Sequence, residues 1–95
     1  MIRTYSAGVH YGILEKIEDK VGDSYSVKLK NATRVYSWAG ACSLSELSVN
    51  GTQNNDTKLS LKVPSIYLKA IEIIEMTPKA VSNLENLKVW EYATL

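Results

Sequence analysis

Polar and apolar residues alternate along two stretches in the first half of the chain, residues 11–17 and 25–30, and a third stretch, residues 33–38, is rich in β-branched and aromatic residues, which favour strands. A period of two places apolar side chains on one face of a β-strand. Residues 18–24 are polar and include a glycine that can take a positive φ, so they are expected to form a hairpin connection. Residues 31–32 are expected to form a second, tighter connection. The pattern therefore predicts an antiparallel meander of three strands.

The alternation also predicts which side chains of these strands lie together. Tyr11, Ile13 and Ile17 share one face of the first strand. In the second strand Val27 and Leu29 are expected to face the core, while the lysines that follow each of them face water.

A short helix is predicted directly after the third strand. Ser43 and Glu46 have the spacing of a capping box, in which the serine side chain accepts a hydrogen bond from a backbone N–H. Two leucines three positions apart share one face of this segment. Gly51 supplies a C-terminal stop, so the predicted helix covers residues 43–50.

The next apolar stretch predicts another strand. Residues 58–63 alternate, with Leu59, Leu61 and Val63 expected to face inward. Pro64 cannot donate a ladder hydrogen bond, so it indicates an edge position or a bulge.

Residues 66–76 form the most apolar run of the chain. A buried helix over residues 65–74 is the alternative to a strand there, and the β-branched content favours a strand, with residues 70–74 in the centre of the sheet. Thr77 and Pro78 are typical of a helix start. The apolar stripe of that helix consists of Val81, Leu84 and Leu87 with Lys88.

Together these elements predict an α+β fold: a small antiparallel sheet made of a meander plus C-terminal strands, a short capped helix after the third strand and a C-terminal helix. Residues 1–95 are expected to form a single compact domain. The polar loop 52–57 and the tail 90–95 are expected to be the most mobile segments. Trp90 and Tyr92 are expected to attach the C-terminus to the sheet or to a neighbouring subunit.

Charge and composition bear on the class of function. Eleven basic and ten acidic residues give a net charge of +1, without the basic excess of a protein whose primary partner is DNA. No run approaches the roughly 18 apolar residues of a membrane span, so no membrane partner is expected. The start of the sequence lacks the pattern of a secretory signal, and the single cysteine allows no internal disulfide, which favours a reducing cytoplasm. A small core with amphipathic aromatic residues favours a homo-oligomer.

The residues do not supply a catalytic or metal-binding set. Cys42 and His10 are the nucleophile and base to consider, but they lie far apart in the sequence and no motif surrounds either. One histidine and one cysteine cannot supply the ligands that a zinc site needs. Glu72 and Glu75 are expected on opposite faces of a strand, which does not suit a paired-carboxylate site. No catalytic residue, cofactor or metal is therefore predicted.

The turn that leads into the first helix is the candidate ligand site. Residues 39–41 are small, so they leave the backbone N–H groups at the helix start open to an anion. An arginine could close over a phosphate there, and an aromatic side chain could stack on a base. A simple helix cap beside a solvated arginine explains the same residues without a ligand. The candidate ligand-binding residues are Arg3, Arg34, Tyr36, Trp38, Gly40, Ser43 and Ser45.

Three segments, residues 3–14, 31–47 and 63–74, carry motifs in a defined order. These motifs are S-A-G-V-H-x-G, then A-x-R-x-x-x-W-x-G-A-x-x-L-x-E-L, then A-I-E-I. On them the chain resembles a family of small phage- and prophage-encoded proteins without an assigned activity. Thr33 stands where members of that family often have a basic residue, which weakens any site built on a doubled positive charge.

The resemblance implies a role in the cytoplasm of a host cell. Small accessory proteins of phages often inhibit host systems, by sequestering a nucleotide signal or by covering the active surface of a host protein. We therefore expect a non-enzymatic counter-defence protein that sequesters a small nucleotide, such as a cyclic nucleotide, or blocks a host defence protein. A protein–protein adaptor that uses exposed Tyr and Trp anchors and a structural, virion-associated phage protein are the alternatives.

Overall fold

The computed structural model describes residues 1–18, 22, 24–38, 41, 43–52 and 57–89. The elements in these ranges are β1 (Ile2–Thr4), β2 (Val9–Ile17), β3 (Tyr25–Ser37), α1 (Leu44–Asn50), β4 (Lys58–Leu59), β5 (Val63–Ile73) and α2 (Pro78–Glu85). The antiparallel sheet, with one helix in the middle of the chain and a second after the last strand, confirms the predicted α+β fold.

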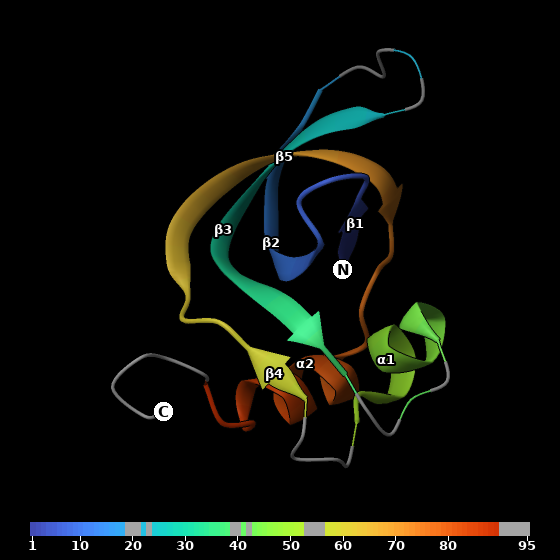
Figure 1. Ribbon diagram of the computed structural model, residues 1–95, viewed down its shortest axis with the longest axis vertical. Coiled ribbons are helices and arrows are strands. Elements are labelled where there is room, and N and C mark those ends of the chain that lie inside the picture. The colour runs from blue at the N-terminus through green and yellow to red at the C-terminus, as the bar shows by residue number, and fades with distance from the viewer. Residues whose placement is uncertain (19–21, 23, 39–40, 42, 53–56, 90–95) are drawn as a thin grey trace.

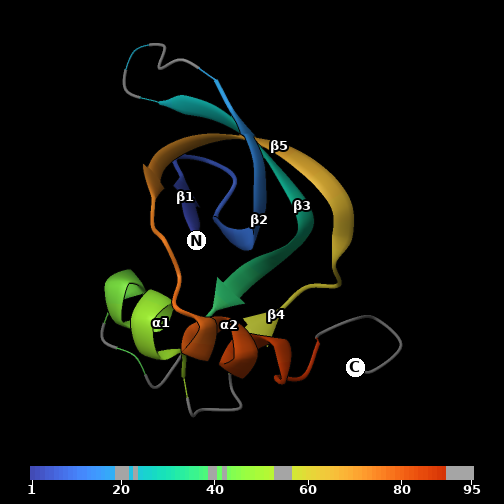
Figure 2. The same ribbon diagram turned by 180° about the vertical axis from the view of Figure 1, so that it is seen from behind.

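Four of the strands close into a ring. β1 pairs antiparallel with β2 and with β5, and β3 pairs antiparallel with the same two strands. β4 adds to the C-terminal end of β3. The strands curl around a common interior (Figure 1), and the view from behind shows the same arrangement (Figure 2). In both views α1, α2 and β4 lie together at one end, and the β2–β3 hairpin extends from the other.

Two apolar clusters hold this arrangement together. One is contributed by β1, β3 and β5 and consists of Ile2, Val27, Leu29, Ala32, Leu68 and Ala70. The other joins the strands to the helices and consists of Met1, Val9, Tyr11, Val35, Leu47, Leu59 and Leu84. The predicted burial of Val27 and Leu29 is confirmed.

β3 is one strand of 13 residues, so the connection predicted at residues 31–32 is wrong. The register with β2 shifts at this point and leaves one extra residue on β3, which is a β-bulge. Asn31 has a φ of 50° there, a conformation that asparagine tolerates better than most residues. Gly12 lies opposite, where a Cβ would come within 2.9 Å of the Lys30 carbonyl oxygen.

The strand predicted over residues 58–63 is interrupted at residues 60–62, which lie between β4 and β5. β4 ends at Leu59, which is buried as predicted, whereas Leu61 and Val63 are exposed. Ser60 forms hydrogen bonds to the backbone of β3 through both its own N–H and its hydroxyl. The chain then leaves β3 before it returns as β5, so the alternation after Ser60 does not correspond to two faces of a sheet.

β5 confirms the strand predicted over residues 65–74 and excludes a helix there. Pro64 is its second residue and is exposed. The alternation in β2 does not translate into burial, because Ile13 and Ile17 are 60% and 50% exposed. β1 has no counterpart among the predicted strands, and it is β1 that closes the ring.

Both helices begin where the sequence predicts. Ser43 Oγ accepts a hydrogen bond of 3.1 Å from a backbone N–H in the first turn of α1, and Gly51 ends that helix. Thr77 caps α2 in the same way. The backbone N–H of Thr77 also donates to the Ser48 carbonyl at 3.1 Å, which ties the start of α2 to α1.

The segments predicted to be most mobile lie mainly outside the described residues, as do Trp90 and Tyr92. Thr52 and Thr57, the described ends of the polar loop, are buried. In the part of the chain that the structure describes, none of the helices combines the length and the apolar character that crossing a bilayer requires.

Candidate functional site

Two of the candidate residues near the start of α1 have structural roles. Ser43 uses its side chain as the cap of the helix, and Trp38 packs against the cluster that joins the strands to the helices. Ser45 is exposed on α1, which has seven residues. Gly40 lies outside the described residues.

The two candidate arginines lie in different surroundings. Arg3 on β1 forms an ion pair with Glu72 on β5, with 3.0 Å between Nε and Oε1. Arg34 on β3 donates from Nε to His10 Nε2 at 3.2 Å, and its guanidinium carbon lies 6.0 Å from the centre of the exposed Tyr36 ring. Neither of the two cavities described below is lined by any of the candidate residues that the structure describes. The anion site therefore stays a prediction.

His10 is the only histidine of the chain and is buried, with 2% of its surface exposed. Its Nε2 accepts the hydrogen bond from Arg34, so the neutral ring carries its proton on Nδ1, which has no hydrogen-bond partner among the described residues. Burial, and then the charge of Arg34, lower the pKa of His10 from 6.5 to about 4. Cys42, the nucleophile considered with it, lies outside the described residues.

We expect His10 to make the fold less stable in mild acid. The unfolded chain takes up a proton near pH 6.5 and the folded chain only near pH 4, so the unfolded state binds more protons across this window. The contribution of His10 to the free energy of unfolding is fully present above pH 6.5 and is lost as the pH falls toward about 4. Linkage gives a loss of about 2 kcal/mol in the free energy of unfolding between about pH 7 and about pH 5. Urea unfolding at the two pH values measures this loss.

The His10→Gln variant is the control for this prediction. Glutamine can still accept a hydrogen bond from Arg34 and does not titrate. The change in its free energy of unfolding between the two pH values should therefore be smaller by the contribution of His10. The buried terminal amine of Met1, whose pKa burial lowers from 8.0 to about 6, contributes a loss of the same sign in both proteins. An equal loss in the wild type and the variant would assign the effect to other groups.

A cavity of about 650 Å³ lies beside β2. Its lining includes residues 11–14 of β2, residues 73–76 at and after the end of β5, and Val81 on α2. Most of these side chains are apolar, and several are open to solvent although they face a concave surface. The exposed fractions are 60% for Ile13, 44% for Leu14, 36% for Ile73 and 37% for Val81.

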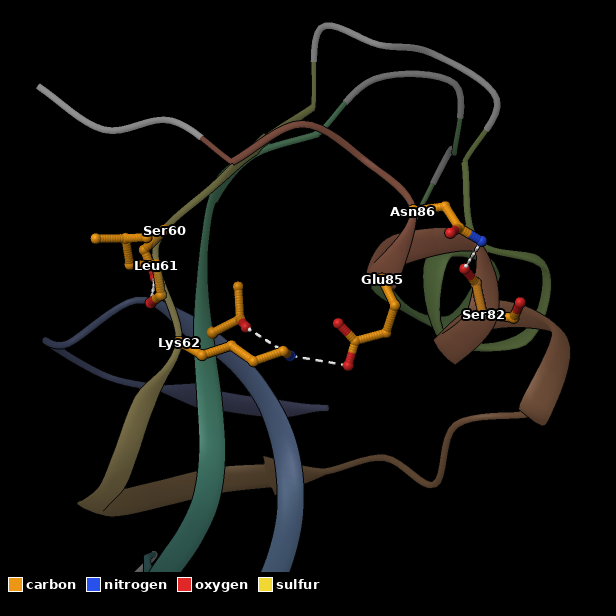
Figure 3. A network of polar contacts seen from close by, with 7 residues as sticks. Ser60, Leu61, Lys62, Ser82, Glu85 and Asn86 are labelled. Atoms are coloured by element: carbon orange, nitrogen blue, oxygen red, sulfur yellow. Dashed lines mark hydrogen bonds and ion pairs between the residues drawn. The ribbon is translucent and has the colours of Figure 1, made fainter. Parts of the chain in front are cut away.

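One edge of this cavity is polar. Lys62, between β4 and β5, reaches across to Glu85 on α2 (Figure 3), with 2.8 Å between Nζ and Oε1. The same Nζ donates to Thr33 Oγ1 at 3.3 Å and lies 5.2 Å from the centre of the Tyr11 ring. The lysine thus connects β2, β3 and α2 at the cavity.

The ionisable side chains of the cavity are those of Tyr11, Lys62, Glu75 and Glu85. Burial, and then the carboxylate of Glu85, raise the pKa of Tyr11 to about 12, so the phenol keeps its proton at neutral pH. Glu75 is exposed at the cavity and forms no ion pair with any residue that the structure describes. With Lys62 opposed by Glu75 and Glu85, the charged side chains of the lining carry one excess negative charge.

A smaller cavity of about 300 Å³ lies between the β2–β3 hairpin and β5, next to Lys16, Lys28 and Tyr67. Lys28 there pairs with Glu15 on β2, with 3.7 Å between Nζ and Oε2. Within the described ranges, no group of three or more His, Cys, Asp or Glu side chains is placed to hold a metal ion.

Sequence reasoning missed the larger cavity, although one local signal exists. Leu14 follows Ile13 directly and makes both faces of β2 apolar at the same place. The alternation over residues 58–63 predicts that Lys62 faces water. Its ion pair with Glu85 on α2 has no local signature, because the two residues are 23 positions apart.

Comparison with known proteins assigns the chain to a family without indicating an activity. A family model described as a domain of unknown function, DUF6948, matches residues 1–84, a range that contains all five strands and α1. No curated protein and no solved structure matches the chain. Because the family model covers well over half of the 95 residues, the chain belongs to the DUF6948 family.

Proposed function

We propose that this protein is a non-enzymatic binding protein and that the cavity beside β2 is its binding site. The observation that carries the proposal is a cavity of about 650 Å³ with a mainly apolar lining and a few fixed polar groups at one edge. Ligand sites have this combination of size and lining. Ile13 and Val81 are open to water there, and covering such side chains favours binding because it removes apolar surface from water.

The polar groups of the cavity support binding over catalysis. A general base works best when its pKa lies near the working pH, whereas Tyr11 keeps its proton with a pKa of about 12. Lys62 is already engaged by Glu85 and by Thr33. Groups in these states orient a bound molecule through hydrogen bonds and charge.

The charge of the cavity bears on the two roles that the sequence predicts. A nucleotide would bring phosphates to a lining with an excess negative charge, contributed by Glu75 and Glu85 against Lys62. An apolar segment of another protein meets no such repulsion. The cavity therefore supports covering a partner protein over sequestering a nucleotide. The phage origin, the host-defence target and the homo-oligomer stay predictions.

A neutral apolar dye, N-phenyl-1-naphthylamine, tests the site. We expect the wild-type protein to bind the dye with a rise in its fluorescence. The Ile13→Lys variant should bind it at least about tenfold more weakly, because burying an isoleucine side chain contributes roughly 1.5–3 kcal/mol.

Ile17→Lys is the matched control. Ile17 is on the same strand and is similarly exposed, but it does not line the cavity. This variant should bind the dye as the wild type does. Failure of the wild type to bind, or equal weakening in both variants, would contradict the proposed site.

A further inference from the structure

The cavity encloses an edge of the sheet and not only one of its faces. Residues 11–14 of β2 all line it, and consecutive side chains of a strand point to opposite faces. Ile13 and Leu14 therefore approach the cavity from the two faces of β2. An occupant that lies along the edge of the strand contacts both of them.

This stretch of β2 has a neighbouring strand on one side only. β1 pairs with β2 at Val9 and His10. Beyond these two residues, the ladder partners of β2 within the described part of the chain all belong to β3. In an antiparallel sheet every second residue directs its N–H and C=O away from a given neighbour. From Gly12 onward, past the place where the register puts Met1 beside Tyr11, this edge consequently offers backbone donors and acceptors to a further strand.

The opposite wall of the cavity continues the line of β5. Met1 and Ile74 exchange two backbone hydrogen bonds, of 2.8 Å from Ile74 N and 2.7 Å from Met1 N, and they extend the ladder between β1 and β5. Glu75 and Met76 follow and line the cavity. At Val9, β1 lies between β2 and β5. Farther along β2, the cavity lies in the corresponding place between the two strands.

We propose that the cavity accepts an extended segment of a partner protein, which adds a strand to the edge of β2 in line with β1. This inference rests on the proposed function and names the class of partner. Addition of a strand to an open sheet edge is a general mode of peptide recognition, in which backbone hydrogen bonds give affinity and side-chain pockets give specificity.

The lining specifies the chemistry of the segment. Apolar side chains at alternate positions match Ile13 and Val81, which lie at the cavity and are open to water. A lysine or arginine matches Glu75, whose carboxylate has no ion-pair partner among the described residues. The partner segment is therefore an extended peptide with alternating apolar residues and one basic residue.

Selection from a library of short random peptides tests this inference. Peptides are selected on the wild-type protein, and those that also bind the Ile13→Lys variant are removed. We expect the enriched sequences to have apolar residues with a period of two and a lysine or arginine. They should displace N-phenyl-1-naphthylamine from the wild type.

N-methylation of one enriched peptide separates strand addition from simple apolar contact. Methyl groups on alternate backbone nitrogens remove the N–H donors on one side of an extended peptide and leave its side chains in place. Methylation on the side that faces β2 should weaken binding about tenfold or more, because several backbone hydrogen bonds are lost. Methylation of the other set of nitrogens should leave the affinity nearly unchanged.

The Glu75→Gln variant tests the basic residue of the segment. It should weaken the peptide about threefold to tenfold, as loss of one partly exposed charge partner does. Glu18→Gln is the control, because Glu18 pairs with Lys16 and does not line this cavity.

The outcomes separate this inference from the proposed function. Strand addition is overturned if no sequences are enriched, if their apolar residues have helical spacing, or if both methylation patterns are tolerated. In those cases dye binding by the wild type would still support the cavity as a site. If the wild type binds neither dye nor peptide, the proposed function fails together with the inference.

Discussion

Replacing Leu84 by alanine is expected to lower the free energy of unfolding by about 3 kcal/mol, within the range of about 2–5 kcal/mol for buried leucines. Leu84 has no exposed surface and lies in the cluster that joins α2 to the strands. Removal of its side chain leaves a void in the cluster that it shares with Leu47 and Leu59, because a packed interior relaxes only in part. Urea unfolding at neutral pH measures the loss.

Val81→Ala on the same helix is the control for this result. Val81 is 37% exposed at the cavity, so its truncation should cost less than about 1 kcal/mol. If the two variants were equally stable, the packing assigned to α2 would be wrong. Since α2 also carries Glu85 of the cavity edge, we expect Leu84→Ala to weaken dye binding as well.

Gly51→Ala is expected to lower the free energy of unfolding by about 3 kcal/mol through two effects, backbone strain and loss of a hydrogen bond. Gly51 ends α1 with φ 70° and ψ −155°, a region that is essentially reserved for glycine. A Cβ there would overlap the side chain of Asn83 on α2. That side chain accepts a hydrogen bond of 2.7 Å from the Thr52 N–H, and displacing it breaks this bond.

Gly8→Ala separates the two effects. Gly8 has a φ of 81°, but a Cβ at this position would meet nothing within 4 Å. Its substitution should therefore show the cost of a positive φ alone, about 1–2 kcal/mol. A loss at Gly51 no larger than the loss at Gly8 would mean that the contact between the end of α1 and Asn83 does not hold the helices together.

The helix starts were predictable because their signals are local. Ser43 and Thr77 each bond a backbone N–H three residues ahead, and this spacing can be seen in the sequence. The same locality explains the error at residues 31–32. Asn31 is a residue typical of turns, but pairing with β2 and β5 keeps β3 in one long strand. The residue that a turn would have used forms a β-bulge instead.

Ring closure was not predictable from local patterns. β1 has three residues and pairs with β5 across most of the chain, for example at Ile2 and Ile73. Such a pairing depends on the whole fold, whereas alternation reports only one strand at a time. Ile13 is an example. It has the spacing of a core residue, but it is exposed because β1 pairs with β2 only at Val9 and His10.

The cavity beside β2 was missed for a related reason. The sequence drew attention to residues 34–45 because a helix cap, small residues and aromatic residues are concentrated there. The cavity is instead assembled from several distant segments, and Lys62 and Glu85 meet only in the folded chain. The adjacent apolar residues Ile13 and Leu14 are the local signal of the cavity in the sequence.

The most direct test of the account is an NMR titration of the labelled protein with N-phenyl-1-naphthylamine. If the cavity beside β2 is the binding site, the amide shifts that change should be those of Gly12, Leu14, Glu75 and Val81, while those of Ser43 and Ser45 stay in place. Changes centred on Arg34, Ser43 and Ser45, with the β2 edge unaffected, would contradict it and would place the site at the start of α1.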